Sequence, residues 1–347
     1  MSLSPHRLYE PRFWVFWKPL LGWMALVLAV SVFLSSTHRA LAQDKPEATK
    51  DDEKELPQPE TIDLVSEDGL QIKATYYPGT KGEESIPVIL LHGFKGSRMD
   101  FPEEQGLGHF LQEKLGCAVI VPDLRGHGDS TLIKISAKRQ EDLKNKKLQP
   151  AQLEKMATQD LLVLRNYLWK KNNEKKLNID KLTVIGVDEG ASLALRYVAY
   201  DAGGYEDGQA RVGPLKLGRF VKAVVLISPL TNVPALKIAL LMRNLPEVRH
   251  DLPLMIALGN KSKDRVAEAE RLNSLFLKLR PPADDNKPES HTIWYFSKIE
   301  TPLQGAKLLA EPSLKVPEKI ASFMSTWLVK NFDAKDWSWA ERKRPYE

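Results

Sequence analysis

Gly186-Val187-Asp188-Glu189-Gly190 is the stretch that decides the fold of this chain. The apolar run 182–185 precedes it, and a run of small residues that can open a helix follows it. Two glycines around one raised residue are typical of a sharp turn between a buried strand and a helix. Such a turn lifts one side chain above a parallel sheet, and that residue is usually a serine. Here it is Asp188, so the stretch predicts a fold while leaving the chemistry open.

Short apolar runs recur along the chain and predict the strands of one sheet. The first two flank Glu67-Asp68-Gly69, which is a hairpin turn signal, and polar or glycine-containing loops follow the others. Helical patterns separate the runs, one starting at Pro150 and the last covering about 317–329. We therefore expect an α/β three-layer sandwich with a mostly parallel central sheet of about eight strands and no large lid domain. The runs are 61–65, 70–77, 86–91, 117–121, 182–187, 221–227, 253–258 and 292–296.

Two more motifs accompany the turn in a fixed order. Leu91-His92-Gly93-Phe94 follows the third run, and Pro122-Asp123-Leu124-Arg125-Gly126-His127-Gly128-Asp129-Ser130 follows the fourth. With the turn, they resemble the α/β-hydrolase fold superfamily, in particular its serine aminopeptidase, monoacylglycerol lipase and dienelactone-hydrolase-like members. The resemblance covers roughly 60–332, and we place the domain at 61–332. It implies an oxyanion hole at Phe94 and Glu189, and a pocket lined by His92, Gly93, His127 and Ser228.

The same resemblance locates a catalytic triad whose three positions have changed. Asp188 stands at the nucleophile position, and Gln304 stands where the histidine belongs. Ser262 falls at the acid position, with Asp264 two residues later. A glutamine cannot accept a proton at any useful pH, which removes the general base that such a triad needs.

Two hypotheses follow from this degenerate triad. The first is a hydrolase-derived protein with little or no turnover, in which Asp188 caps the next helix through the helix dipole and its free N–H groups. This protein would bind a small ligand or a partner in the old pocket. The second is an active hydrolase of small esters, amides or lipids that uses Asp188, or an unorthodox base such as His127, Asp264 or Glu189. Neither hypothesis involves a cofactor.

The ends of the chain differ in composition from the domain. Residues 1–42 combine basic residues, an apolar run and a small-residue cleavage pattern, so we expect a signal peptide that ends at Ala42. An uncleaved membrane anchor is the alternative. Residues 43–60 are expected to be a charged flexible linker, and 333–347 a tail rich in tryptophan and basic residues. The protein is then exported, periplasmic or extracellular, and touches a membrane only through its N-terminal segment.

Charge and cysteine content narrow the classes of partner. Cys117 is the only cysteine, so no disulfide can form within the chain, and we expect it to be a core residue. The net charge of +5 is spread through sequence of mixed sign. The most basic stretch, 134–147, lacks aromatic residues, which favours a solvated helix face or loop over a nucleic-acid site. No spacing of histidine and acidic residues indicates a metal site. The oligomeric state stays open.

Overall fold

The computed structural model describes residues 55–203, 220–240, 252–279, 294–330 and 337–342. They belong to the compact unit Lys54–Glu347. The predicted signal segment 1–42 and all but the end of the predicted linker 43–60 lie outside these residues, as do His250 and His291. In the part that is described, no helix is long and apolar enough to cross a membrane.

Eight strands form one sheet in the order β1-β2-β4-β3-β7-β8-β9-β10. The pairs β1–β2 and β2–β4 are antiparallel, and the other neighbours in this sheet are parallel. The predicted sheet is confirmed, with each strand close to its predicted run. The strands are β1 (Glu60–Val65), β2 (Gln71–Tyr77), β3 (Pro87–Leu91), β4 (Ala118–Pro122), β7 (Leu182–Val187), β8 (Val221–Ile227), β9 (Leu254–Gly259) and β10 (Trp294–Ile299).

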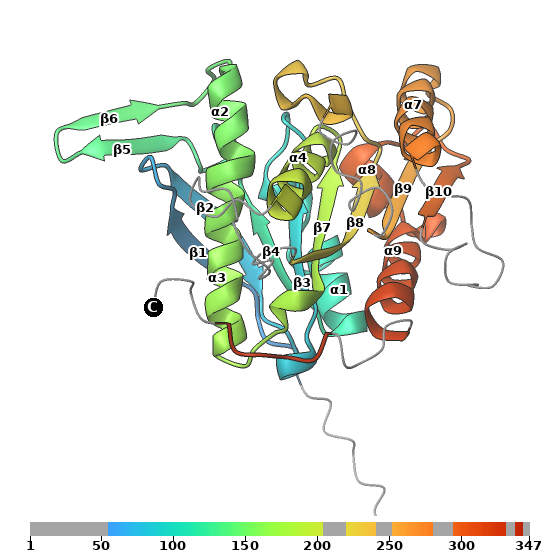
Figure 1. Cartoon of the computed structure of the whole chain (residues 1–347), viewed down its shortest axis with the longest axis horizontal. Coiled ribbons are helices and arrows are strands. Elements are labelled where there is room, and N and C mark those ends of the chain that lie inside the picture. Colours follow the sequence, from blue (N-terminus) through green and yellow to red (C-terminus); the bar gives the residue numbers. More distant parts are fainter. Residues whose placement is uncertain (1–54, 204–219, 241–251, 280–293, 331–336, 343–347) are drawn as a thin grey trace, which may run out of the picture. The chain divides into compact units, whose positions relative to one another are not determined.

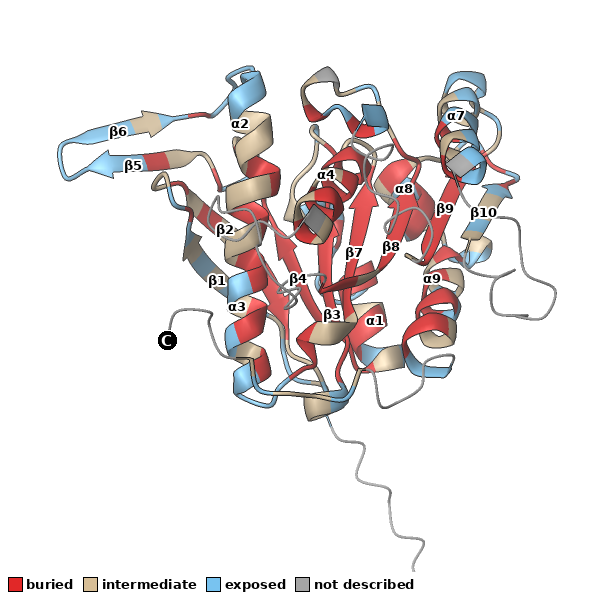
Figure 2. Cartoon of the chain, in the orientation of Figure 1, coloured by how far each residue is buried: buried red, intermediate tan, exposed pale blue. Residues whose placement is uncertain are grey.

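Helices cover both faces of this sheet, and the buried strands lie between them (Figures 1 and 2). Because side chains alternate along a strand, β7 sends Val184 into the core beneath α3 and α4, and Ile185 into the core beneath α1 and α9. The three-layer α/β sandwich is thereby confirmed, and no lid domain is evident among the described residues. The helices are α1 (Leu107–Leu115), α2 (Pro150–Lys155), α3 (Leu161–Asn173), α4 (Gly190–Gly203), α7 (Lys263–Leu279), α8 (Gly305–Ala310) and α9 (Val316–Ser325).

Cys117 is fully buried in the core beneath α1, as predicted. Burial raises the pKa of its thiol to about 12, so the side chain stays protonated and unreactive at neutral pH. The cysteine therefore packs as a small apolar residue.

The basic stretch 134–147 differs from its prediction. It contains β5 (Leu132–Ser136) and β6 (Arg139–Asp142), which pair as an antiparallel hairpin instead of forming a helix face or loop. The hairpin starts where the Lys134 N–H donates to the Gly69 carbonyl at 2.9 Å. The β-branched Ile133 and Ile135 alternate with polar residues, which is a strand pattern that the lysines obscured.

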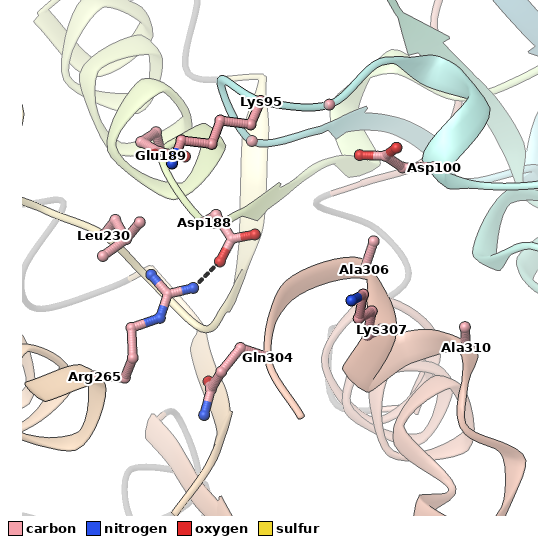
Figure 3. A pocket seen from close by; sticks show the side chains of 12 residues that line it. Lys95, Asp100, Asp188, Glu189, Leu230, Arg265, Gln304, Ala306, Lys307 and Ala310 are labelled. Atoms are coloured by element: carbon pink, nitrogen blue, oxygen red, sulfur yellow. Dashed lines mark hydrogen bonds and ion pairs between the residues drawn. The ribbon is translucent and has the colours of Figure 1, made fainter. Parts of the chain in front are cut away.

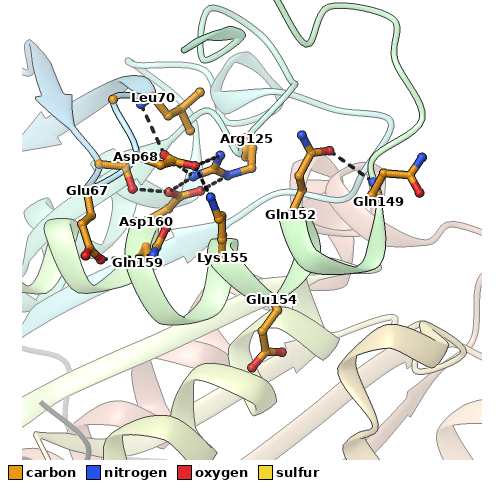
Figure 4. A network of polar contacts seen from close by, with 12 residues as sticks. Glu67, Asp68, Leu70, Arg125, Gln149, Gln152, Glu154, Lys155, Gln159 and Asp160 are labelled. Carbon is orange, nitrogen blue, oxygen red and sulfur yellow. Dashed lines mark hydrogen bonds and ion pairs between the residues drawn. The ribbon is translucent and has the colours of Figure 1, made fainter. Parts of the chain in front are cut away.

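A buried network joins the turn before β2 to the loop after β4 and to the helix region before α3 (Figure 4). The Arg125 side chain is fully buried. It donates to Asp160 at 2.7 and 2.9 Å and to Asp68 at 2.8 and 3.0 Å. Asp160 ends a π-helical turn, Met156–Asp160, that interrupts the helix predicted to run on from Pro150. The turn places this carboxylate in the core opposite Arg125.

Asp68 should make stability depend on pH. Burial opposes its ionisation, but hydrogen bonds from Arg125 and Lys155 outweigh burial and lower the pKa of Asp68 to about 2. A lowered folded-state pKa gives stability that is present above the ordinary value of 3.8 and lost as pH falls toward 2. We expect Asp68→Asn to have a lower free energy of unfolding than the wild type at pH 6. This difference in free energy should shrink as the pH falls from 3.8 to about 2. Urea unfolding across that range measures it, and a constant difference would contradict it.

The tail packs on the body at the end of the sheet opposite the Asp188 turn (Figure 1). Asn178 donates its side-chain N–H to the Trp337 carbonyl at 2.7 Å, and Asn172 donates to the Ala340 carbonyl at 3.0 Å. The Trp169 indole donates to the Arg342 carbonyl at 2.6 Å. Side-chain donors of the body thus hold the main chain of the tail against the body.

Removing this tail should destabilise the domain. A chain that stops at Lys330 leaves the buried Asn172 and Asn178 donors without their carbonyl partners, and each such loss costs about 1–3 kcal/mol. We expect the free energy of unfolding in urea to fall by at least about 2 kcal/mol. A chain that stops at Arg342 keeps all these contacts and is the control. Equal stability of the two shortened chains would refute this role of the tail.

Candidate functional site

The Asp188 turn has the backbone that its sequence predicts. β7 ends at Val187, α4 begins at Gly190, and Asp188 between them has φ 52°. Its N–H donates to the Ile227 carbonyl and its carbonyl accepts from the Leu230 N–H, both at 3.0 Å. A Cβ at Gly190 would come within 2.6 Å of the His92 carbonyl oxygen, so only glycine fits. The turn therefore raises Asp188 above the carboxyl end of the sheet.

The Asp188 carboxylate forms an ion pair with Arg265, in the first turn of α7 (Figure 3). The two side chains are only 25% and 17% exposed, so the pair is largely shielded from water. Gly305 has φ 58°, and a Cβ there would collide with the same carboxylate. No side-chain bond from Asp188 to the start of α4 accompanies these contacts among the described residues, so the predicted helix cap is replaced by an ion pair.

Two further carboxylates, Glu189 and Asp100, lie near the raised residue. Burial raises the pKa of Asp188, Arg265 opposes this rise, and the negative charges of Glu189 and Asp100 add to it. The pKa of Asp100 is raised as well, chiefly by burial. These carboxylates oppose a further anion beside them, such as the oxyanion of an ester hydrolysis, although Lys95, Arg265 and Lys307 line the same pocket.

Glu189 occupies the donor that an oxyanion would need. Its carboxylate accepts a hydrogen bond from the Phe94 N–H at 3.1 Å. Phe94 N–H is the group that the resemblance assigns to the oxyanion hole, and Glu189 N–H is its expected second donor. The Glu189 carboxylate therefore occupies the Phe94 N–H, which is one of the two donors expected in the oxyanion hole. The other expected donor is the N–H of Glu189 itself.

Gln304 stands between β10 and α8, at the position expected for a histidine. Its Nε2 donates to the Gly259 carbonyl at 2.8 Å, at the end of β9. Its Oε1 is buried and has no hydrogen-bond partner among the described residues. The Gln304 side chain thus lies against the end of β9, where the resemblance predicts a triad histidine. An amide cannot act as the general base that a histidine would supply.

The acid position holds no carboxylate that reaches the site. Ser262 precedes α7, and its carbonyl accepts from the Val266 N–H at 2.9 Å. Asp264 lies exposed in the first turn of α7. Neither residue lines the pocket, whereas Arg265, one position further on, does. The segment after β9 therefore brings the Arg265 cation of α7 to the pocket, whereas the resemblance predicts a carboxylate there.

The residues expected to line the pocket divide into two groups. Gly93 lines it, but His92, His127 and Ser228 lie behind its wall. The Ser228 hydroxyl is buried and accepts from the Gly305 N–H at 3.0 Å. Ser228 therefore holds the start of α8 and does not reach a ligand.

Both histidines brace loops. His92 Nε2 accepts from the Leu124 N–H at 3.0 Å, so the proton lies on Nδ1, which donates to the Gly93 carbonyl at 2.7 Å. Burial lowers the pKa of His92 to about 4, which keeps it neutral. The ring nitrogens of His127 face the carbonyls of Arg125 and Phe94. Neither ring has a nitrogen left to activate a water in the pocket.

The pocket is open to solvent and has a volume of ≈ 730 Å³. Leu230 and Ala306 give it apolar wall, and charged groups surround the ion pair (Figure 3). Among the described residues, no group of three histidine, cysteine, aspartate or glutamate side chains is placed to hold a metal ion. The lining residues are Gly93, Lys95, Gly96, Asp100, Asp188, Glu189, Leu230, Arg265, Gln304, Ala306, Lys307 and Ala310.

Arg265 is the site residue that sequence reasoning missed. Its position in an amphipathic helix, three residues after Ser262, gives no sign that it points toward Asp188. The available signal was indirect: a carboxylate at the tip of a buried turn requires a cation or donors nearby. The acid loop was one place to look for that cation, because Lys261, Lys263 and Arg265 alternate there with other residues.

Comparison with known proteins agrees with this architecture. A family model described as alpha/beta hydrolase fold matches residues 86–306. The esterase Pf2001 of Pyrococcus furiosus is similar in structure, with a TM-score of 0.52 at 15% identity over 78% of this chain and 92% of that chain. A dienelactone hydrolase from Anabaena variabilis has a TM-score of 0.47 at 18% identity, over 78% of this chain and 97% of that chain. No curated protein sequence matches the chain. At 15% identity the Pf2001 structure supports the fold alone.

Proposed function

This chain belongs to the α/β hydrolase fold family, and we propose that it is a member without hydrolytic turnover that holds a small ligand in the former substrate pocket. The contact between the Glu189 carboxylate and the Phe94 N–H carries this proposal. It fills the donor that must stabilise a developing oxyanion, and such donors contribute about 10²–10³ to the rate of acyl transfer.

The nucleophile position supports the same conclusion. Asp188 is held by Arg265, and freeing it for attack breaks an ion pair that water reaches poorly. Attack by this carboxylate on an ester would also give a mixed anhydride, which is a poor intermediate for acyl transfer. The ion pair therefore suits a structural or ligand-binding role better than a nucleophilic one.

No histidine among the described residues is placed to deprotonate a water in the pocket. Gln304 cannot act as a base, and both nitrogens of His92 and of His127 are engaged by backbone groups. The alternative of an active hydrolase would rely on a carboxylate: Asp264 is exposed outside the pocket, Glu189 is bonded to Phe94, and Asp100 lines the pocket with a pKa that burial raises.

A pocket that keeps its lining but lacks catalytic groups still offers a binding site for a small molecule, so we expect the protein to retain a ligand. Native mass spectrometry of the chain from Gln43 onward should find a co-purified small molecule in the wild type. Ala306→Trp fills the pocket and should lose this molecule. Ala137→Trp, at an exposed hairpin turn, is the matched control and should keep it. A wild type without any bound molecule, or one whose molecule survives Ala306→Trp, would argue against ligand holding.

We also propose that residues 1–42 direct export, with cleavage after Ala42. The basic, apolar and small-residue regions of this segment support the proposal. Expression of the full chain in a bacterium, followed by N-terminal sequencing of the exported protein, should give Gln43 as its first residue. An intact N-terminus in the membrane fraction would favour the anchor instead.

A further inference from the structure

The hairpin β5–β6, here called the arm, stands away from the helices and the main sheet (Figure 1). Its base is anchored, because Ile133 is buried and bridges to Leu70 beside β2. Beyond that point every residue from 134 to 140 is exposed (Figure 2). The outer part of the arm therefore makes no contribution to the core of the domain.

An exposed two-stranded hairpin is only marginally stable in water, and it gains most from a third strand. The arm is open to one, since within the described chain β6 pairs with β5 alone. Its free edge presents main-chain N–H and C=O groups, which an extended peptide can bind as an added strand. Ile135, 48% exposed, offers such a peptide an apolar contact near the tip.

The arm and the loop that follows it, up to Lys147, are basic, and few of their charges are neutralised. Residues 134–147 contain six basic side chains against Glu141 and Asp142. Glu141 pairs with Lys146 at 3.5 Å, and Asp142 accepts from the Lys144 N–H at 2.8 Å, so both acids are engaged. Among the described residues, none of the remaining basic side chains has an ion pair: Lys134, Lys138, Arg139, Lys144 and Lys147.

These properties select one class of partner. Lysines on an open edge repel a second copy of the same strand. The segment 131–149 has no aromatic residue on which a nucleic-acid base could stack, and it lacks the broad apolar face that inserts into a lipid surface. We propose that the arm binds an acidic, extended polypeptide segment of a partner protein, which adds to the hairpin as a strand.

The test uses the chain from Gln43 onward and a fluorescent peptide of alternating glutamate and valine, with binding followed by anisotropy. Lys134→Glu, Lys138→Glu and Arg139→Glu together should weaken binding at least about tenfold, because opposite charges across paired strands become like charges. The control reverses Lys170, Lys176 and Lys278, which are exposed elsewhere, and should leave the affinity unchanged. Because residues 134–140 are exposed, the arm variant should not change the urea midpoint.

A peptide of alternating glutamate and proline separates strand addition from simple attraction. It carries the same charge but lacks the N–H groups of a strand, so it should bind at least about tenfold more weakly. Equal binding of the two peptides would overturn the added strand. Equal loss in both triple variants would overturn the arm as the site. Binding of phosphatidylglycerol vesicles or single-stranded DNA without binding of the peptide would overturn the choice of partner.

Discussion

A chain carrying Asp188→Ser, Ser262→Asp, Gln304→His and Glu189→Ala is expected to hydrolyse p-nitrophenyl acetate at least about 100-fold faster than the chain with only the first three changes. The three changes rebuild a nucleophile, an acid and a base at the positions where the fold places them. They leave the Glu189 carboxylate on the Phe94 N–H, where it repels the oxyanion. Removing that carboxylate frees the donor, and one such donor contributes about 10²–10³ to the rate.

The control for this prediction is Glu189→Gln in the same rebuilt background. Glutamine removes the charge but its oxygen can still accept from the Phe94 N–H, so the rate should fall between the rates of the rebuilt chains with glutamate and with alanine at this position. Initial rates at matched protein concentration measure all three. Equal rates with glutamate and with alanine would show that the oxyanion hole has been lost for some reason other than Glu189.

Arg125→Met is expected to destabilise the domain by about 3–5 kcal/mol, which is the cost of removing one partner from a buried charge network. Asp160, 6% exposed, would keep only the hydroxyl of Ser66, which donates to it at 2.6 Å. Asp68 would keep Lys155 at 2.9 Å and the Leu70 N–H at 3.4 Å. The free energy of unfolding in urea at pH 7 measures the loss.

A second variant separates lost charge pairing from lost packing. Adding Asp160→Leu to Arg125→Met removes the stranded carboxylate, so a substantial part of the stability should return. If the double variant is no more stable than Arg125→Met, the packing of the arginine stem matters more than its charge. A loss of under about 1 kcal/mol in the single variant would contradict a structural role for the network.

The sheet could be predicted from the sequence because each strand announces itself locally. The runs at β3 and β8 are apolar on both faces, as strands between two helix layers must be, and glycine or polar loops follow them. The turn at Asp188 fixes the direction of crossing from β7 to α4. These signals depend on nearest neighbours in the chain and need no knowledge of distant contacts.

The arm and the π-helical turn before α3 escaped prediction for a different reason. All residues of β6 are polar or charged, and the alternation of Ile133 and Ile135 in β5 is too short to indicate a strand by itself. The π-helical turn ends at Asp160, which contacts Arg125 35 positions away. Partners at that separation leave no periodic trace in either segment.

The same distinction between local signals and distant contacts explains which features of the site could be predicted. The positions of Asp188 and Gln304 could be predicted, because their motifs are local. Their contacts could not: Arg265 reaches Asp188 across 77 positions, and Glu189 reaches Phe94 across 95. The sequence therefore indicates where the site lies, and only the folded structure shows which distant residues contact Asp188 and Phe94 there.

The most direct test of the central claim is turnover of p-nitrophenyl acetate and butyrate by the purified chain from Gln43 onward, compared with Asp188→Ala prepared identically. If Glu189 and Arg265 hold the site in a non-hydrolytic state, both proteins should release p-nitrophenol no faster than buffer containing an equal amount of an unrelated protein. Release by the wild type that disappears in Asp188→Ala would contradict the account and make Asp188 a working nucleophile.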